Sequence, residues 1–84
     1  MTRINYASWL SVRLQKDHDE FSLPLEVSNI SKLIDWLMEQ NSDYRSVFSH
    51  KEVIYAACNG SIISHETLIN KNEEITFFAP IAGG

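Results

Sequence analysis

The sequence predicts a single α+β domain in which a mixed sheet packs against one main helix. Segments near both ends of the chain alternate between apolar and polar residues, which is typical of half-buried strands. One segment between them repeats its apolar residues at helical spacing. A length of 84 residues and a hydrophobic content of 44% suffice for one compact core and argue against disorder.

The first predicted strand lies at the start of the chain. Residues 2–7 place Ile4 and Tyr6 on one side and Arg3 and Asn5 on the other. This is the period of two expected of a strand with one buried face. The domain is therefore expected to begin in the sheet.

A second strand is predicted after a polar connection. Residues 8–14 contain apolar side chains without a clean period, and we expect a loop that packs on the sheet. Residues 16–20 are the most polar stretch of the chain and predict a solvated turn. The strand that follows, at roughly residues 20–27, contains Pro24, which lacks an N–H group and therefore indicates the edge of the sheet.

The main helix is predicted to begin at Ile30. Asn29 is a suitable N-cap, because its side chain can accept a hydrogen bond from a free N–H group of the first turn. Residues 41–42 end the helical pattern, and Trp36 and Met38 lie at the margins of its buried face. The apolar stripe expected to face the sheet consists of Ile30, Leu33, Ile34 and Leu37.

After the main helix we expect a shorter helix and a strand hairpin. Ser42 is the expected cap of a helix over residues 43–48. Residues 53–58 form a nearly continuous apolar run, which is typical of a buried strand. Asn59-Gly60 favours a tight turn, and residues 62–63 begin a short return strand.

The last strand is predicted over residues 74–79. It follows a brief helical turn at residues 66–69 and a second turn at residues 70–73. Alternation places Phe77 on the face covered by the helix and Phe78 on the opposite face. An aromatic ring on the outer face is a candidate contact for a partner protein, and the alternative is that a loop of this chain covers it.

Charge and composition exclude several classes of partner. The formal charge of −4 has the wrong sign for a surface that binds phosphates, so we expect no nucleic-acid partner. The first residues lack the apolar segment of a secretory signal, and no apolar stretch is long enough to span a membrane. A single cysteine agrees with a reducing compartment. We therefore expect a cytoplasmic protein with no membrane partner.

The chain ends in an apolar segment that is unusual for a small domain, Phe77-Phe78-Ala79-Pro80-Ile81-Ala82-Gly83-Gly84. Gly83 and Gly84 lack a Cβ, so they fit a channel too narrow for other residues. We divide the chain into a domain at residues 1–79 and a flexible tail at residues 80–84, which reaches at most about 20 Å when extended. Such a tail suits a reactive terminus delivered into a neighbouring active site.

The order of these elements, with the Gly-Gly ending, resembles the ubiquitin-like β-grasp family. Within that group, residues 77–84 resemble the Phe-Phe-x-Pro-x-x-Gly-Gly ending of the small, sulfur-carrying subunit of molybdopterin synthase. Residues 57–60, Ala-Cys-Asn-Gly, are similar to that family's Ala-Val-Asn turn, and residues 68–77 are similar to its approach to the tail. The chain departs from the pattern at Asn72-Glu73, where many relatives have Gly-Asp, and Arg13 lies later than the relatives' basic residue.

The resemblance implies a role in molybdenum cofactor biosynthesis. An adenylyltransferase similar to ubiquitin-activating enzymes would use ATP to convert the Gly84 carboxylate to an acyl-adenylate, and sulfur would then replace one oxygen. The large catalytic subunit of molybdopterin synthase would present this thiocarboxylate to cyclic pyranopterin monophosphate. Gly83 belongs to the same reactive end, and the residues expected to contact the partner are Phe78, Pro80, Ile81 and Ala82.

The chain is expected to be a carrier and not an enzyme by itself, because its tail has no acid, base or nucleophilic side chain. Cys58 could act as a sulfur relay, but a cysteine in an apolar strand usually behaves as a small hydrophobe. His18, His50 and His65 lack the spacing of zinc ligands, and residues 17–20 lack the glycine and spaced oxygens of a calcium loop. We expect no permanently bound metal or cofactor.

Three other roles remain open for a chain with this ending. A sulfur carrier of the thiamine pathway shares the β-grasp fold and the Gly-Gly terminus, but the Phe-Phe-x-Pro approach favours the molybdopterin branch. A ubiquitin-like modifier would use the same activated Gly84 to form an isopeptide bond with lysines. An ordinary binding module would have an inert terminus.

Overall fold

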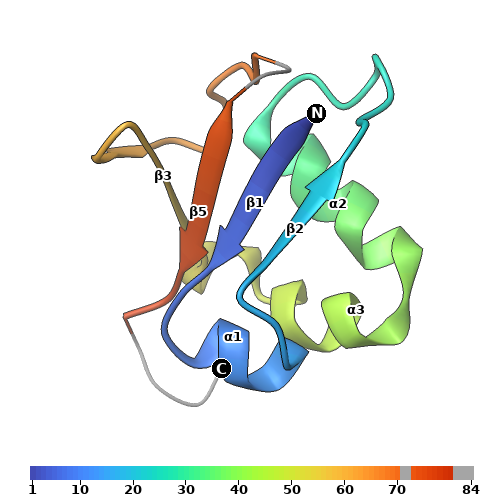
Figure 1. The fold of residues 1–84 in the computed structure, drawn as a ribbon, viewed down its shortest axis with the longest axis vertical. Helices are drawn as coiled ribbons and strands as arrows, with labels where there is room; N and C mark the ends of the chain where they lie inside the picture. Colours follow the sequence, from blue (N-terminus) through green and yellow to red (C-terminus); the bar gives the residue numbers. More distant parts are fainter. Residues whose placement is uncertain (71–72, 81–84) are drawn as a thin grey trace.

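A computed structural model of the chain describes residues 1–70 and 73–80. Five strands form one sheet in the order β2-β1-β5-β3-β4, and α2 is the longest helix (Figure 1), so the α+β class is confirmed. The elements are β1 (Thr2–Tyr6), α1 (Trp9–Leu14), β2 (His18–Phe21), α2 (Ile30–Gln40), α3 (Ser42–Phe48), the 3-10 helix η1 (Lys51–Val53), β3 (Tyr55–Cys58), β4 (Ser61–Ile63) and β5 (Glu74–Phe78).

The sheet is mixed because its first and last strands are parallel neighbours. In this pair Ile4 lies beside Ile75, and Tyr6 lies beside Phe77. The other pairs, β1 with β2, β5 with β3 and β3 with β4, are antiparallel. Figure 1 shows α2 behind the sheet, and no described helix crosses the front of the strands. The sheet therefore has an inner face covered by α2 and an outer face that no described helix covers.

The main helix forms as the sequence predicts. The apolar stripe of α2 is entirely buried, and Trp36 and Met38 lie half-buried at the margins of the core. The Asn29 side chain accepts a hydrogen bond from the Lys32 N–H group at 2.8 Å, which satisfies one of the free donors of the first turn. The predicted start, N-cap and buried face of this helix are all confirmed.

The segment between β1 and β2 is a helix, so the loop predicted at residues 8–14 is wrong. Leu10 and Leu14 lie four residues apart on α1, and both are buried in the core. Gln15 ends the helix in the left-handed conformation, and the next N–H group, that of Lys16, donates to the Ser11 carbonyl at 3.2 Å. A helix this short contains one apolar i,i+4 pair, which is too little to reveal a period.

The second strand is shorter and begins earlier than predicted. β2 ends at Phe21, so Pro24 lies in the loop beyond the strand and not within it. The predicted edge position is nevertheless confirmed, because β2 pairs only with β1 among the described strands. Residues 18–20, which the sequence analysis places in a solvated turn, belong to this strand.

The N-cap of α3 is Asn41, and the predicted cap Ser42 is wrong. The Asn41 side chain accepts hydrogen bonds from the N–H groups of Asp43 and Tyr44 at 2.9 and 3.2 Å. Ser42 is itself the first residue of the helix, so its side chain is one position too late to cap it. Asn41, with an extended backbone, both ends α2 and begins α3.

The apolar run at residues 53–58 is shared between two elements, so the prediction of one buried strand is wrong. η1 ends at Val53, and β3 begins at Tyr55. Ala56 is fully buried, whereas Tyr55 is 43% exposed, because adjacent residues of a strand face opposite sides of the sheet. The tight turn at Asn59-Gly60 is confirmed, with φ angles of 54° and 79°.

The brief helical turn predicted at residues 66–69 does not form. The Thr67 N–H group donates to the Ser64 carbonyl at 3.1 Å in a single turn, and Leu68 then makes an isolated antiparallel bridge with Asn29. This stretch therefore runs in extended form past the start of α2.

The turn predicted at residues 70–73 lies partly outside the described residues, because 71–72 are not among them. The two ends of this turn are joined by a hydrogen bond from the Glu73 N–H group to the Asn70 carbonyl at 3.0 Å. Among the helices that the structure describes, none is long and apolar enough to cross a membrane.

Candidate functional site

β5 anchors the end of the domain in the middle of the sheet. Phe77 is fully buried, and its ring meets that of Phe48 edge-on with the centroids 5.2 Å apart. The Phe77 carbonyl accepts a hydrogen bond from the Ala7 N–H group at 2.9 Å. The prediction that Phe77 belongs to the core is confirmed.

Burial ends soon after Phe77. Ala79 is 2% exposed, and Pro80, the last described residue, is exposed. The predicted contact residue Pro80 thus lies at the surface, where β5 has left the sheet. The other predicted tail residues, Ile81, Ala82, Gly83 and Gly84, lie outside the described part of the chain.

Phe78 lies on the outer face of the sheet, as the alternation predicts. It is half-buried, and its ring centroid is 5.7 Å from that of Tyr55, its cross-strand neighbour on β3. A neighbouring strand, and not a loop, provides this partial cover. The two rings therefore form a paired aromatic surface.

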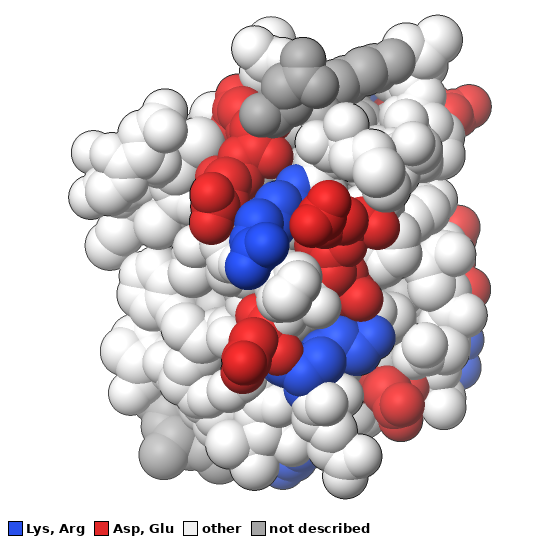
Figure 2. Space-filling view, viewed as in Figure 1, with Lys and Arg blue, Asp and Glu red and all other residues white. Residues whose placement is uncertain are grey.

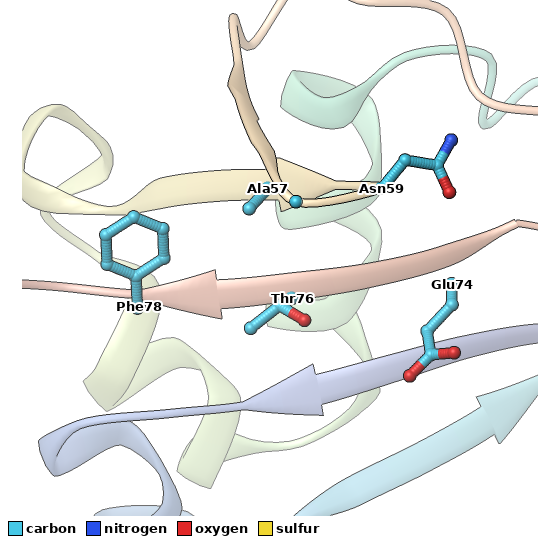
Figure 3. Close-up of a pocket in the computed structure, with 6 residues that line it drawn as sticks. Ala57, Asn59, Glu74, Thr76 and Phe78 are labelled. Atoms are coloured by element: carbon cyan, nitrogen blue, oxygen red, sulfur yellow. The ribbon is translucent and has the colours of Figure 1, made fainter.

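A shallow hollow of about 500 Å³ lies on the outer face beside Phe78. Figure 3 shows the side chains of Phe78, Thr76 and Glu74 along β5, opposite Ala57 and Asn59. The hollow thus has an aromatic ring at one end and a carboxylate at the other. Its lining residues are Ala57, Asn59, Gly60, Glu74, Thr76 and Phe78.

Apolar side chains extend this surface across three strands. Ile62 is 67% exposed and pairs with Ala57, just as Tyr55 pairs with Phe78. We call Tyr55, Ala57, Ile62 and Phe78 the outer apolar patch. Only Phe78 of these four was predicted from the sequence. Alternation over residues 55–58 is the sequence signal that would place Tyr55 and Ala57 on the outer face.

The other half of the outer face carries charges, as Figure 2 shows. Arg3 lies between Glu20 and Glu74, with nitrogen to oxygen distances of 3.8 and 3.7 Å. The Asn5 side-chain amide donates to Glu74 at 2.6 Å. Exposed ion pairs of this kind add little stability, so their main effect is to give the patch an acidic border.

Asp19 lies at the centre of a polar network that the sequence analysis missed. Its Oδ2 atom accepts hydrogen bonds from the hydroxyl groups of Tyr6 at 2.8 Å and Tyr44 at 2.5 Å. Lys16 lies 3.2 Å from its other oxygen and donates to the Tyr44 hydroxyl at 3.1 Å. Asp19 therefore ties the edge strand β2 to β1 and α3, and the predicted solvated turn is wrong for this residue.

The network shifts the pKa values of its members. Burial raises the pKa of Tyr6, and the hydrogen bond to Asp19 raises it further. Burial opposes ionisation of Asp19, but hydrogen bonds from Tyr44, Tyr6 and Lys16 outweigh burial and lower the pKa of its carboxyl group. Asp19 is therefore a carboxylate at neutral pH.

Cys58 has a weakly ionised thiol. Its Sγ atom lies 3.0 Å from Glu73 Oε2, and this hydrogen bond, with burial, raises the pKa of the thiol to about 11. The thiolate is the nucleophilic form of cysteine, so a raised pKa makes this side chain a poor relay for sulfur. The geometry favours the interpretation of Cys58 as a structural residue.

The three histidines lie apart. His18 and His50 are exposed, and His65 Nε2 lies 2.7 Å from the Ile54 carbonyl oxygen. Within residues 1–70 and 73–80, no three His, Cys, Asp or Glu side chains are grouped closely enough to hold a metal ion. The structure gives no residue set that would fit a resident metal in this region.

These features define a small protein of the ubiquitin-like β-grasp fold. The mixed sheet packs one face on α2, and its parallel central pair brings the first strand beside the last. The last strand presents an aromatic ring outward and leads directly to the Gly-Gly segment.

The chain belongs to the ThiS family, whose model matches residues 11–84. Its fold is similar to that of a Pyrococcus furiosus protein assigned as molybdopterin converting factor subunit 1, with a TM-score of 0.72, 17% identity and coverage of 95% of this chain and 97% of that one. SAMP1 from Haloferax volcanii matches with a TM-score of 0.69, 16% identity and coverage of 99% and 98%. No curated protein gave a significant match. The expected β-grasp fold is confirmed.

Proposed function

We propose that this chain is the sulfur carrier of molybdopterin synthase. The observation that carries the proposal is the ending Phe77-Phe78-Ala79-Pro80-Ile81-Ala82-Gly83-Gly84 on a ThiS-family domain. The fold shared with molybdopterin converting factor subunit 1 of Pyrococcus furiosus supports it. In this role, the chain supplies molybdenum cofactor biosynthesis with sulfur carried at Gly84.

The chemistry takes place at the carboxyl group of Gly84. An adenylyltransferase related to ubiquitin-activating enzymes joins this carboxylate to AMP from ATP and releases pyrophosphate. A sulfur donor then displaces AMP, which leaves a thiocarboxylate. Inside the large subunit of molybdopterin synthase, the thiocarboxylate sulfur attacks cyclic pyranopterin monophosphate, and hydrolysis returns Gly84 to a carboxylate.

The domain contributes delivery and not catalysis. β5 holds Phe77 in the core, so the segment that carries Gly84 begins, at Pro80, directly after a strand that is fixed in the sheet. The outer apolar patch lies on the neighbouring strands and supplies the surface on which the partner rests. Phe78 and Pro80, with Ile81 and Ala82, contact the partner, while Gly83 and Gly84 enter its active site.

The proposal is tested by producing the chain together with its adenylyltransferase and a sulfur source. Intact-protein mass spectrometry should show sulfur replacing one oxygen, and fragmentation should place the change in the C-terminal peptide. Deletion of Gly84, or addition of one residue after it, should abolish the change. The Glu66→Gln variant, altered at an exposed carboxylate elsewhere, should form the thiocarboxylate to the same extent as the original chain.

Two outcomes would assign the activated terminus to another role. Adducts linked to lysine, without a thiocarboxylate, would favour a ubiquitin-like modifier. A thiocarboxylate that supplies the thiamine thiazole, and not cyclic pyranopterin monophosphate with the large subunit, would favour the thiamine pathway, which the ThiS-family match keeps as the second candidate. Thiocarboxylate formation that persists after deletion of Gly84 would contradict every version of the carrier proposal.

A further inference from the structure

The free edge of β2 offers backbone hydrogen-bonding groups on the side away from β1. The Tyr6 N–H group donates to the Asp17 carbonyl at 2.8 Å, which makes that pair a hydrogen-bonded one. Hydrogen-bonded and non-bonded pairs alternate along an antiparallel ladder, and His18 and Glu20 fall on the non-bonded positions. Their N–H and C=O groups therefore face the open edge.

A second feature is a hollow of about 190 Å³ that is lined in part by Trp36 of α2. The ring of Phe21, the last residue of β2, packs edge-on against Trp36 of α2 with the centroids 5.0 Å apart. Trp36 is half-buried, so part of its ring borders the hollow. A strand paired with His18 and Glu20 would pass from the β2 edge toward this ring. The hollow is lined by Glu26, Val27, Lys32, Asp35, Trp36 and Glu39.

The hollow has an excess of negative charge. Three of its lining residues are carboxylates, and only Lys32 is basic. Asp35 is already paired with Lys51 at 2.6 Å, and the Lys32 ammonium lies 3.4 Å from the Ser28 hydroxyl. Glu26 and Glu39 form no ion pair or hydrogen bond with any other described residue. An aromatic ring between free carboxylates suits the side chain of lysine or arginine.

The acidic side chains along the free edge of β2 also favour one kind of binding partner. Asp17 and Glu20 flank the backbone groups that face outward, and Glu20 also lies 3.8 Å from Arg3. Two copies of β2 joined edge to edge would bring these carboxylates together, which is unfavourable. An extended segment with basic side chains would instead place opposite charges across the new ladder.

We propose that the free edge of β2 and the hollow beside Trp36 together bind an extended, lysine- or arginine-containing segment of a partner protein. The segment adds a strand beside β2 and places a basic side chain over Trp36 between Glu26 and Glu39. This surface lies on the edge opposite β4 and uses none of the residues assigned to the tail or the outer apolar patch. It is a second docking site, independent of the proposed sulfur chemistry.

The test uses the full chain and a synthetic peptide that alternates valine and lysine, with a valine-glutamate peptide as the matched control. In ¹H–¹⁵N NMR titrations the lysine peptide should shift the amide signals of His18 and Glu20 and the indole signal of Trp36. The same two amides should become protected from hydrogen exchange. Glu26→Gln and Glu39→Gln should each weaken binding by about 1.5- to 5-fold, whereas Glu66→Gln should not.

A backbone variant separates strand pairing from simple charge attraction. Glu20→Pro removes an N–H group that faces the open edge and leaves the β1 ladder intact, whereas Glu20→Gln removes only the charge. Relative to Glu20→Gln, the proline variant should weaken binding a further 2- to 10-fold, roughly the loss of one hydrogen bond. Its unchanged β1 amide signals would show that the fold is kept.

Three results would overturn the proposal. The glutamate peptide could bind as tightly as the lysine peptide. The lysine peptide could leave the amides of His18 and Glu20 unshifted at millimolar concentration. Sedimentation could instead reveal a concentration-dependent dimer that Glu20→Pro abolishes, which would assign the edge to a second copy of this chain.

Discussion

At the scale of single residues, two adjacent aromatic rings on β5 have opposite environments. Phe77 is fully buried, and Phe78 rests half-covered on Tyr55. The period of two in the sequence predicted this difference, because successive strand residues face opposite sides of a sheet. It could not predict Tyr55 as the neighbour of Phe78, since that contact depends on the register of two separate strands.

We therefore expect Phe78→Ala to separate binding from stability. Loss of the ring should weaken binding to the proposed partner, the large subunit of molybdopterin synthase, about 10-fold or more, as for an aromatic side chain at an interface centre. The melting temperature should fall only slightly, because the ring is half-exposed. Phe77→Ala is the control and should cost about 3–5 kcal/mol of unfolding free energy. A large thermal shift for Phe78→Ala, measured by calorimetry, would show that the ring is part of the core.

Asp19 makes the stability of the domain depend on acid pH. Its folded-state pKa is lowered by hydrogen bonds from Tyr44, Tyr6 and Lys16, which outweigh the effect of burial. A lowered pKa means that the unfolded chain binds a proton first as the pH falls. The contribution of Asp19 is thus complete at neutral pH and is lost as the pH falls below about 5 toward the folded pKa.

Asp19→Asn should lower the unfolding free energy at pH 7 by about 1–3 kcal/mol, because two buried tyrosine hydroxyls lose a charged acceptor. The difference from the original chain should shrink as the pH falls below about 5. Urea unfolding at several pH values measures both effects. Asp17→Asn, a neighbouring exposed carboxylate, is the matched control. A difference that stays constant down to pH 2 would contradict the assigned role.

At the scale of elements, the quality of the sequence prediction follows the length of the element. α2 has three turns with a complete apolar stripe and a capping residue, and its bounds were predicted correctly. α1 has six residues and one apolar pair, so nothing in its sequence distinguishes a helix from a packed loop. The predicted range of β2 was too late in the sequence, because Pro24 was assumed to lie inside the strand.

The cap of α3 offers a test at this scale. Asn41→Ala should destabilise the domain by about 1 kcal/mol, because the N–H groups of Asp43 and Tyr44 lose their acceptor. Ser42→Ala should change the unfolding free energy by less than about 0.5 kcal/mol, since Ser42 is an exposed first residue of the helix. Urea unfolding compares the two variants. A larger effect at Ser42 would restore it as the cap.

At the scale of the whole molecule, the C-terminal motif could be predicted from the sequence, but the surfaces built from several elements could not. The Gly-Gly ending and the order of elements were legible in the sequence and led to the correct fold. The outer apolar patch was not, because Tyr55 and Ile62 join Phe78 only through the order of β5, β3 and β4. The Asp19 network was missed for the same reason, since its members come from β1, β2, α3 and the turn at Lys16.

The position of β5 also bears on how the protein is made. β5 joins β1 and β2 to β3 and β4, yet it is the last strand to leave the ribosome. Until then β1 and β2 share no strand with β3 and β4, and the parallel pair of β1 with β5 joins residues far apart in the sequence, such as Arg3 and Glu74. Completion of the sheet is therefore expected to wait until β5 has been made. The proposed adenylyltransferase would then meet the Gly-Gly segment on a domain whose sheet is complete.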